Sequence, residues 1–192
     1  MRYFRYLTVV LVLLFFSCSK PKPSPRPVAY FRLNLPPKHY VRFNPDSCPY
    51  SFDIPVYARV MPDRDEKHPH HCWMTIVFPA LKAAISVTYY PVEGNLEQLV
   101  DDSYTLAYKH SIRADDITEK EFVNKKYGVY ATVFDITGNA ASPMQFHITD
   151  STRHFFRGSL YFRARPNRDS LDPAIKFLEK DIIRMIESFR WK

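Results

Sequence analysis

The sequence predicts an α+β domain in which a mainly antiparallel sheet is flanked by two helices, an α/β/α-layered arrangement. Several short segments alternate apolar and polar residues or are apolar throughout, as strands do. Two further segments repeat apolar residues at steps of three and four, as helices do. The order is strands, helix, a run of strands, helix, which favours helices packed on an antiparallel sheet. Apolar residues make up 46% of the chain and aromatic residues 16%, so a real core is available and wholesale disorder is excluded.

The chain begins with the pattern of a secretory signal. Arg2 and Arg5 precede an apolar run over residues 7–16, and small residues follow it. The run has about half the roughly 20 residues that a membrane-spanning helix needs. We therefore expect residues 1–17 to be a signal peptide that is removed.

The junction Ser17-Cys18 resembles a bacterial lipobox, although Phe15 stands where that motif usually has leucine. It predicts that Cys18 carries a diacylglycerol thioether and an acylated amino terminus, with palmitate-type chains. The alternative is an ordinary cleaved signal with an incidental cysteine. The Pro/Lys-rich stretch over residues 18–29 favours lipidation, because its polyproline II geometry suits a semi-rigid tether.

Net charge separates the tether from the domain. The chain has a formal charge of +7, and its first 45 residues contain eight Lys or Arg and no acid. Removing these eight leaves −1 for residues 46–192. The basicity thus belongs to the leader and tether, beside a lipid surface, and no cationic excess on the domain indicates nucleic-acid binding.

Three cysteines are present: Cys18, Cys48 and Cys72. If Cys18 carries lipid, Cys48 and Cys72 remain as an even pair in an exported chain, where disulfides persist. Such a disulfide would stabilise the fold by about 3 kcal/mol in the chain-entropy model. Two unpaired buried thiols are the alternative.

The elements before the first helix are strands. Residues 30–47 are expected to be an arm packed on the edge of a globular domain that spans residues 48–192. Residues 50–55 alternate and form a half-buried strand. A polar loop follows over residues 61–71, and then two strands over residues 72–79 and 83–91, joined by a turn.

The first helix is predicted over residues 96–109, with Asn95 as N-cap and Gln98 completing a capping box. Asp115 and Asp116 begin a polar edge strand. Residues 127–136 are apolar on both faces, as a covered central strand should be.

The remaining strands are residues 144–150, which alternate cleanly, and residues 155–164. Gly158 in the latter marks a bulge or a close approach. The last helix is predicted with Ser170 as its cap and Asp172 in its first turn. Its apolar positions recur at helical spacing and are Leu171, Ile175, Leu178, Ile182, Ile186 and Phe189.

Metal and catalytic chemistry were each weighed against a plainer alternative. His68, His70, His71 and Cys72 suit zinc or copper, but a solvated loop whose cysteine pairs with Cys48 explains them, so neither metal nor cofactor is expected. The chain has no nucleophile elbow, zinc-protease helix, phosphate loop or dinucleotide fingerprint. The candidates for a catalytic or ligand site are His110, His147, Asp115 and Asp116, and they are scattered.

Aromatic residues with arginine are typical anchors of protein interfaces. Tyr30 and Phe31 in the arm are candidates for such contacts. Arg157, Tyr161 and Arg163 alternate on one face of a strand and could form a basic-aromatic strip.

The element order resembles the Mog1/PsbP-like fold. The chain more specifically resembles the gliding-motility lipoprotein GldD family of Bacteroidetes, over Tyr30 to Phe189. The motifs that carry this resemblance are Tyr-Phe-Arg-Leu-Asn-Leu-Pro in the arm, Cys48-Pro-Tyr-Ser-Phe, Cys72-Trp with the following Val-Phe-Pro, Asn95-Leu-Glu-Gln-Leu-Val-Asp-Asp-Ser, and Ala107-Tyr-Lys-His. The loop at 68–71 departs from the family.

The resemblance implies an outer-membrane lipoprotein on the periplasmic face that works with the gliding machinery and the type IX secretion system. It would be a non-enzymatic accessory or stabilising factor, and its partners would be the membrane and other envelope lipoproteins or secretion proteins. A periplasmic ligand-binding module or hydrolase of unknown substrate is the alternative.

Overall fold

A computed structural model of the chain describes residues 34–63 and 72–192. The predicted signal peptide, the tether and the first residues of the arm therefore lie outside the described residues, as do the histidines at 68, 70 and 71.

A seven-stranded antiparallel sheet forms the centre of the domain, in the order β3-β4-β5-β9-β8-β7-β6. Its strands are β3 (Arg59–Pro62), β4 (Met74–Phe78), β5 (Ala83–Pro91), β6 (Ala114–Asn124), β7 (Val129–Gly138), β8 (Met144–Thr149) and β9 (His154–Phe162). A second sheet has the order β1-β2-β10. Its strands are β1 (Tyr40–Phe43), β2 (Tyr50–Pro55) and β10 (Arg190–Trp191).

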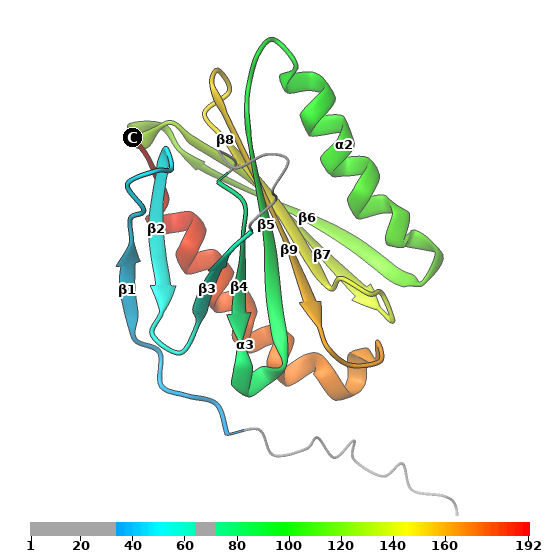
Figure 1. Cartoon of the computed structure of the whole chain (residues 1–192). Coiled ribbons are helices and arrows are strands. Elements are labelled where there is room, and N and C mark those ends of the chain that lie inside the picture. The colour runs from blue at the N-terminus through cyan, green and yellow to red at the C-terminus, as the bar shows by residue number, and fades with distance from the viewer. Residues whose placement is uncertain (1–33, 64–71) are drawn as a thin grey trace, which may run out of the picture.

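The two helices, α2 (Leu96–Tyr108) and α3 (Arg168–Ser188), cover opposite faces of the large sheet. Figure 1 shows α3 behind the strands, with the small sheet beside it, and α2 on the other side. Alternate residues of β8 confirm this placement, because His147 contacts Ser103 of α2 whereas Phe146 packs in the core that includes α3. The predicted α+β class with α/β/α layers is confirmed.

The main core lies between the large sheet, α3 and β2. Aromatic rings fill its centre: Phe52 stacks on Phe189 at 5.8 Å between centroids, and Phe156 meets both rings edge-on. Helix α3 buries one stripe against this core, as predicted, including Ile175, Leu178, Ile182 and Ile186. Among the described residues, no helix is long and apolar enough to cross a membrane.

The packing beneath α2 is much thinner. Only Ser103 and Ala107 of that helix are fully buried, over a small cluster around Phe134 and Ile136. Yet α2 covers β8 so well that all six of its residues are buried. The alternation in residues 144–150 is typical of a strand with one solvent-exposed face. The structure instead buries the polar residues Gln145, His147 and Thr149 beneath the helix.

Local capping differs from the predictions. The side chain of Asn167, rather than Ser170, caps α3 by accepting a hydrogen bond from the Ser170 backbone N–H, so the helix begins at Arg168. Asn95 precedes α2 but its side chain makes no cap bond; it accepts from the Glu93 N–H instead. The predicted loop over residues 61–71 also overlaps the end of β3.

Gly158 of β9 pairs directly with Phe146 of β8, and the pairing register there is continuous, without a bulge. A Cβ at this position would lie 2.2 Å from the ring of Phe146, which is itself fully buried. The glycine therefore leaves room for the phenyl ring in the main core.

We predict that Gly158→Ala destabilises the domain by about 2–4 kcal/mol, because the rigid ring has no space to move in a close-packed core. Urea unfolding followed by circular dichroism measures the change. Gly158→Ala should lower the free energy of unfolding by less in a Phe146→Leu background than in the wild-type protein. Stability losses that simply add would contradict the steric explanation.

Candidate functional site

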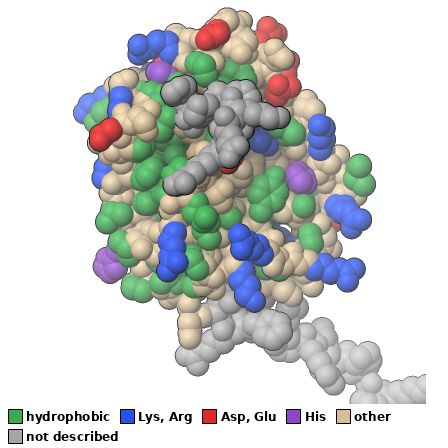
Figure 2. All heavy atoms as spheres, in the orientation of Figure 1, with side chains coloured by type: hydrophobic (Ala, Val, Ile, Leu, Met, Phe, Trp, Pro, Cys, Tyr) green, Lys and Arg blue, Asp and Glu red, His purple; other side chains and the backbone are tan. Residues whose placement is uncertain are grey.

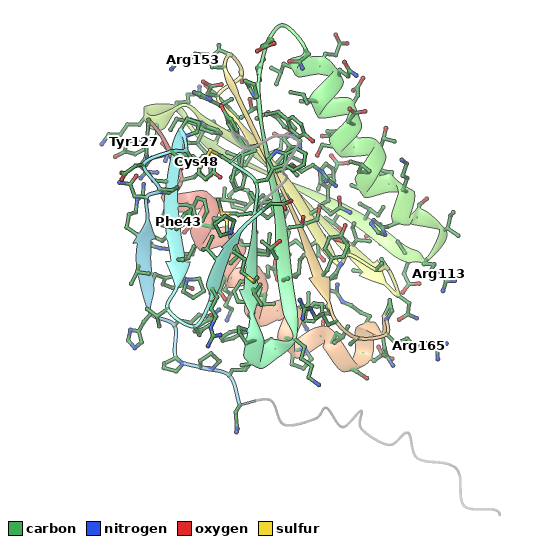
Figure 3. All side chains as sticks on the ribbon, in the orientation of Figure 1. Phe43, Cys48, Arg113, Tyr127, Arg153 and Arg165 are labelled. Atoms are coloured by element: carbon green, nitrogen blue, oxygen red, sulfur yellow. A yellow bond between two sulfur atoms is a disulfide. The ribbon has the colours of Figure 1, made fainter. Side chains whose placement is uncertain are left out.

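The described part of the arm is held along β2. Strand β1 pairs with β2 with Tyr40 opposite Pro55 and Phe43 opposite Phe52, and the Phe43 and Phe52 rings lie 5.3 Å apart. Figure 3 shows Phe43 on β1 beside β2. The arm thus becomes the outer strand of the small sheet, and the chain toward the predicted tether leaves from its beginning.

A buried carboxylate in α3 fixes the beginning of this arm. Asp181 is 2% exposed and accepts hydrogen bonds from Lys38 Nζ at 2.5 Å, Tyr40 OH at 2.8 Å and Tyr57 OH at 2.6 Å. The three donors come from the arm, from β1 and from the loop between β2 and β3. A buried charge with three donors is well satisfied, and it joins three segments that are distant in sequence.

The donors are themselves desolvated. Lys38 Nζ also donates to the Phe177 carbonyl at 2.8 Å and lies 3.4 Å from the centroid of the Phe177 ring. Burial lowers the pKa of Lys38, although Asp181 acts in the opposite direction. Burial, and then the hydrogen bond to Asp181, raise the pKa of Tyr40 and of Tyr57, so both remain neutral donors at neutral pH.

A second set of polar contacts fixes the arm near the other end of β1. Arg42 donates to the Ser188 carbonyl at 2.6 Å and to Ser51 Oγ at 2.7 Å, and it pairs with Asp53 at 3.3 Å. Asp53 is also bound by Arg184 of α3 at 2.7 Å. The arm is therefore tied to α3 at both ends of β1.

A disulfide joins Cys48 to Cys72, the pairing expected from the sequence. It links the chain before β2 to the chain before β4, and Tyr50 OH donates to the Cys72 carbonyl at 2.6 Å beside it. Figure 3 places Cys48 at the upper end of β2, opposite the end where the arm begins.

The second candidate region is a cleft of about 320 Å³ between α2 and the strands β5 and β9. It is lined by Thr88, Tyr90, Leu99, Asp102, Ser103, Thr105, Leu106, Lys109, Phe155 and Arg157. Beneath it, Ser103 Oγ and His147 Nδ1 lie 3.1 Å apart, and Arg157 donates to Gln145 Oε1 at 2.5 Å. The volume suits a small ligand.

The groups proposed for catalysis do not converge there. Burial, and then the charge of Arg157, lower the pKa of His147 to about 4, so the ring is neutral at pH 7. Burial and Arg157 also lower the pKa of His110. Asp115 and Asp116 are instead exposed at the beginning of β6, where the Asp116 carboxylate accepts from Thr118. The arrangement lacks an exposed nucleophile with a base and an orienting acid among the described residues.

The residues predicted for protein contacts differ in whether the structure describes them and in whether they are exposed. Cys18, Tyr30 and Phe31 lie outside the described residues. Tyr161 is 41% exposed and Arg163 is exposed, whereas Arg157 is turned into the cleft beneath α2. The expected basic-aromatic strip is therefore exposed to solvent only at Tyr161 and Arg163, and not at Arg157.

Metal ligation finds no support in the described part of the chain. It contains no group of three or more His, Cys, Asp or Glu side chains that could hold an ion, and Cys72 is in the disulfide. The three loop histidines lie outside the described residues.

Asp181 was not anticipated from the sequence, although a signal for it exists. It follows Leu178 by three residues and precedes Met185 by four, so it stands on the apolar stripe of α3. A carboxylate on a buried stripe requires donors from elsewhere in the fold.

Comparison with known proteins decides the family. The family model for gliding motility lipoprotein GldD matches residues 20–191. The chain belongs to the gliding motility lipoprotein GldD family. The match covers residues 20–29 of the tether, the arm and the described domain up to Trp191, and it confirms the resemblance seen in the sequence. Membership places the chain among envelope lipoproteins involved in gliding motility. No curated protein matches the chain.

Among solved structures, the fold of this GldD-family chain is similar to the solution structure of cyanobacterial PsbP (CyanoP) from Synechocystis sp. PCC 6803. The TM-score is 0.50 at 11% sequence identity, and the alignment covers 90% of this chain and 100% of that chain. At this identity the likeness shows the fold alone, and it confirms the predicted PsbP-like architecture.

We predict that Asp181→Ala loosens the arm, because it leaves the half-buried Lys38 ammonium without its carboxylate. The expected loss of unfolding free energy is about 2 kcal/mol or more. Limited trypsin digestion of the folded protein, followed by mass spectrometry, should show faster cleavage after Lys38. Glu187→Ala, an exposed change on the same helix, is the matched control. Equal cleavage rates in the two variants would count against the arm-fixing role.

We also predict a pH dependence that originates at His147. The folded state holds its pKa at about 4, below the ordinary value of 6.5. Its contribution to stability is therefore fully present above pH 6.5 and is lost as the pH falls toward 4. The loss is up to about 3 kcal/mol. Urea unfolding at several pH values should show a shallower dependence in His147→Gln than in wild type. His39→Gln, at an exposed histidine, should keep the wild-type slope; a wild-type slope in His147→Gln would contradict the assignment.

Proposed function

We propose that this protein is a non-enzymatic accessory factor, anchored by lipid on Cys18 to the periplasmic face of the outer membrane. It would stabilise other envelope proteins of the gliding machinery and the type IX secretion system. The family match carries the proposal, because it spans the tether from residue 20 together with the arm and the domain. The coupling of arm and domain adds to it.

That coupling is a mechanical requirement of an anchored scaffold. The chain toward Cys18 enters a strand that is held to α3 by Asp181 at one end and by the Ser188 carbonyl at the other. A lipid anchor confines a domain to a thin layer over one leaflet and raises its effective concentration for neighbours. A firm junction with the arm then limits the positions that the domain can take.

The placement of the candidate catalytic groups supports a scaffold over a hydrolase. Ser103 is 1% exposed although it borders the cleft, and His147 next to it is 5% exposed, so little of this pair is open to a substrate. Asp115 and Asp116 stand apart on an edge strand. Exposed Tyr161 is the described aromatic residue that best fits the expected partner contact.

A ligand-binding module is the second candidate, and one observation favours it. The cleft beneath α2 combines the apolar side chains Leu99, Leu106 and Phe155 with the basic side chains Lys109 and Arg157. The carboxylate of Asp102 lines the same cleft, so the lining suits a small amphipathic ligand with polar groups at one end. In that case, a single cleft substitution would abolish function without altering protein abundance.

We predict that deletion abolishes gliding, reduces type IX-dependent secretion and lowers the level of at least one other envelope lipoprotein. Complementation separates the causes. His110→Ala and Asp116→Ala should each restore secretion, because neither group belongs to a working site. Cys18→Ala should lose incorporation of a palmitate analogue and fail to restore function. Secretion assays, immunoblots of envelope lipoproteins and metabolic labelling provide the measurements.

Two outcomes would sink the proposal. One is loss of secretion in His110→Ala or Asp116→Ala at normal protein level and with normal co-purifying partners, which would indicate a catalytic or ligand site. The other is equal palmitate labelling in Cys18→Ala and wild type, which would remove the lipid anchor.

A further inference from the structure

One end of the domain gathers several turns and the departing arm. The pairing places Arg59 opposite Val77, next to the turn that joins β4 and β5, and Ala83 opposite Phe162 at the end of β9. The Arg163 N–H donates to the Lys82 carbonyl at 2.8 Å and closes this edge. Figure 1 shows the chain before β1 leaving from the same end, below the loop between β2 and β3.

Exposed cations surround this end. Arg59, Lys82, Arg163 and Arg165 are all exposed, and none forms a salt bridge or hydrogen bond through its side chain with a described residue. We call these four side chains the basic end. Figure 2 shows several Lys and Arg on the lower part of this face and others at its upper left and right, whereas the Asp and Glu visible on it lie mainly at the top.

Acidic groups do not neutralise the basic end. The acids nearest to these cations in sequence are Asp53 and Asp63 around β3, and Asp169 and Asp172 in the first turns of α3. Asp63 follows the far end of β3, and Asp53 pairs with Arg42 and Arg184. Asp172 already pairs with Lys176 at 2.7 Å and with Arg168 at 3.6 Å. The domain as a whole is close to neutral, since residues 46–192 sum to −1, and exposed cations also stand at the opposite end, at Lys125, Lys126 and Arg153. What distinguishes the basic end is its position beside the departing arm.

Apolar residues stand at the tips between these cations. Val56, in the loop between β2 and β3, is 56% exposed, and Pro79 and Ala80 are exposed in the turn after β4. Small exposed apolar tips with cations around them suit the boundary between headgroups and acyl chains. A protein partner would call for a shaped pocket or aromatic anchors, and the cleft beneath α2 is lined by none of the four basic-end side chains.

We propose that the basic end docks on the anionic phospholipid surface of the membrane that carries the anchor, and so orients the domain. This rests on the proposed lipidation of Cys18. The chain from Cys18 to Asn34 can extend to about 50 Å in polyproline II geometry, so the tether alone leaves the orientation open. Each cation that reaches an anionic surface favours docking by roughly fivefold. The docked domain turns the opposite end, with the loop that carries Arg153, away from the membrane (Figure 3).

The test uses the mature lipidated chain on vesicles of phosphatidylethanolamine and phosphatidylglycerol, with neutral phosphatidylcholine vesicles for comparison. A membrane-impermeant amine reagent, quantified by peptide mass spectrometry, reports on Lys82 at the basic end and on Lys125 and Lys126 at the opposite end. We expect Lys82 labelling to be slower by about fivefold or more on the anionic vesicles. Labelling of Lys125 and Lys126 should be equal on both, and high salt should remove the difference at Lys82.

Matched variants identify the surface. Arg59→Glu, Arg163→Glu and Arg165→Glu together should abolish the protection of Lys82. Lys125→Glu, Lys126→Glu and Arg153→Glu together change the net charge equally at the other end and should preserve it. All six positions are exposed, and thermal unfolding verifies that both variants fold.

Equal Lys82 labelling on anionic and neutral vesicles, or protection that survives reversal of the basic end, would overturn the docking. Flotation reports on the anchor separately. A chain that fails to float on neutral vesicles contradicts the lipidation, and Lys82 protection on the anionic vesicles then still decides whether the basic end binds them.

Discussion

The structure depends most on one buried carboxylate. Asp181 is almost fully removed from solvent, and an isolated charge in such a place would cost several kcal/mol. The cost is offset only while the Lys38 ammonium and the hydroxyls of Tyr40 and Tyr57 stay in position. The same contact therefore sets the position of α3, the start of the arm and the loop after β2, and none of these segments can shift alone.

The two helical layers contribute unequally. Helix α3 buries a continuous stripe in a core rich in aromatic rings, whereas α2 rests on a small cluster and leaves a cleft open at its side. Beneath α2, His147 and Gln145 form hydrogen bonds, whereas Arg157 Nε and Ser159 Oγ are buried there without a hydrogen-bond partner. The α2 layer is consequently the one best suited to adjust to a neighbour, while α3 and the small sheet hold the arm.

Sequence periodicity was sufficient for the helices and most of the large sheet, because their apolar spacing is set by burial within each element. It was insufficient where burial comes from another part of the chain. The polar residues of β8 are covered by α2, and no pattern within the strand itself could predict that. Strands β3 and β10 have only four and two residues, too short for periodicity. The disulfide followed from cysteine arithmetic, but Asp181 required knowledge that Lys38 and Tyr57 converge on α3.

Strand β2 lies between the first and the last strand of the described chain, since β1 pairs with one of its edges and β10 with the other. The chain toward the tether enters β1 at the end where the strand begins, so tension with a component along the strand axis loads the ladder in that direction. Ladder hydrogen bonds run perpendicular to antiparallel strands, and such a load shears them together instead of opening them one after another. The ion pair between Lys38 and Asp181 stands ahead of the ladder and takes the load first. The geometry makes the attachment resist pulling, a property suited to a lipoprotein whose neighbours move.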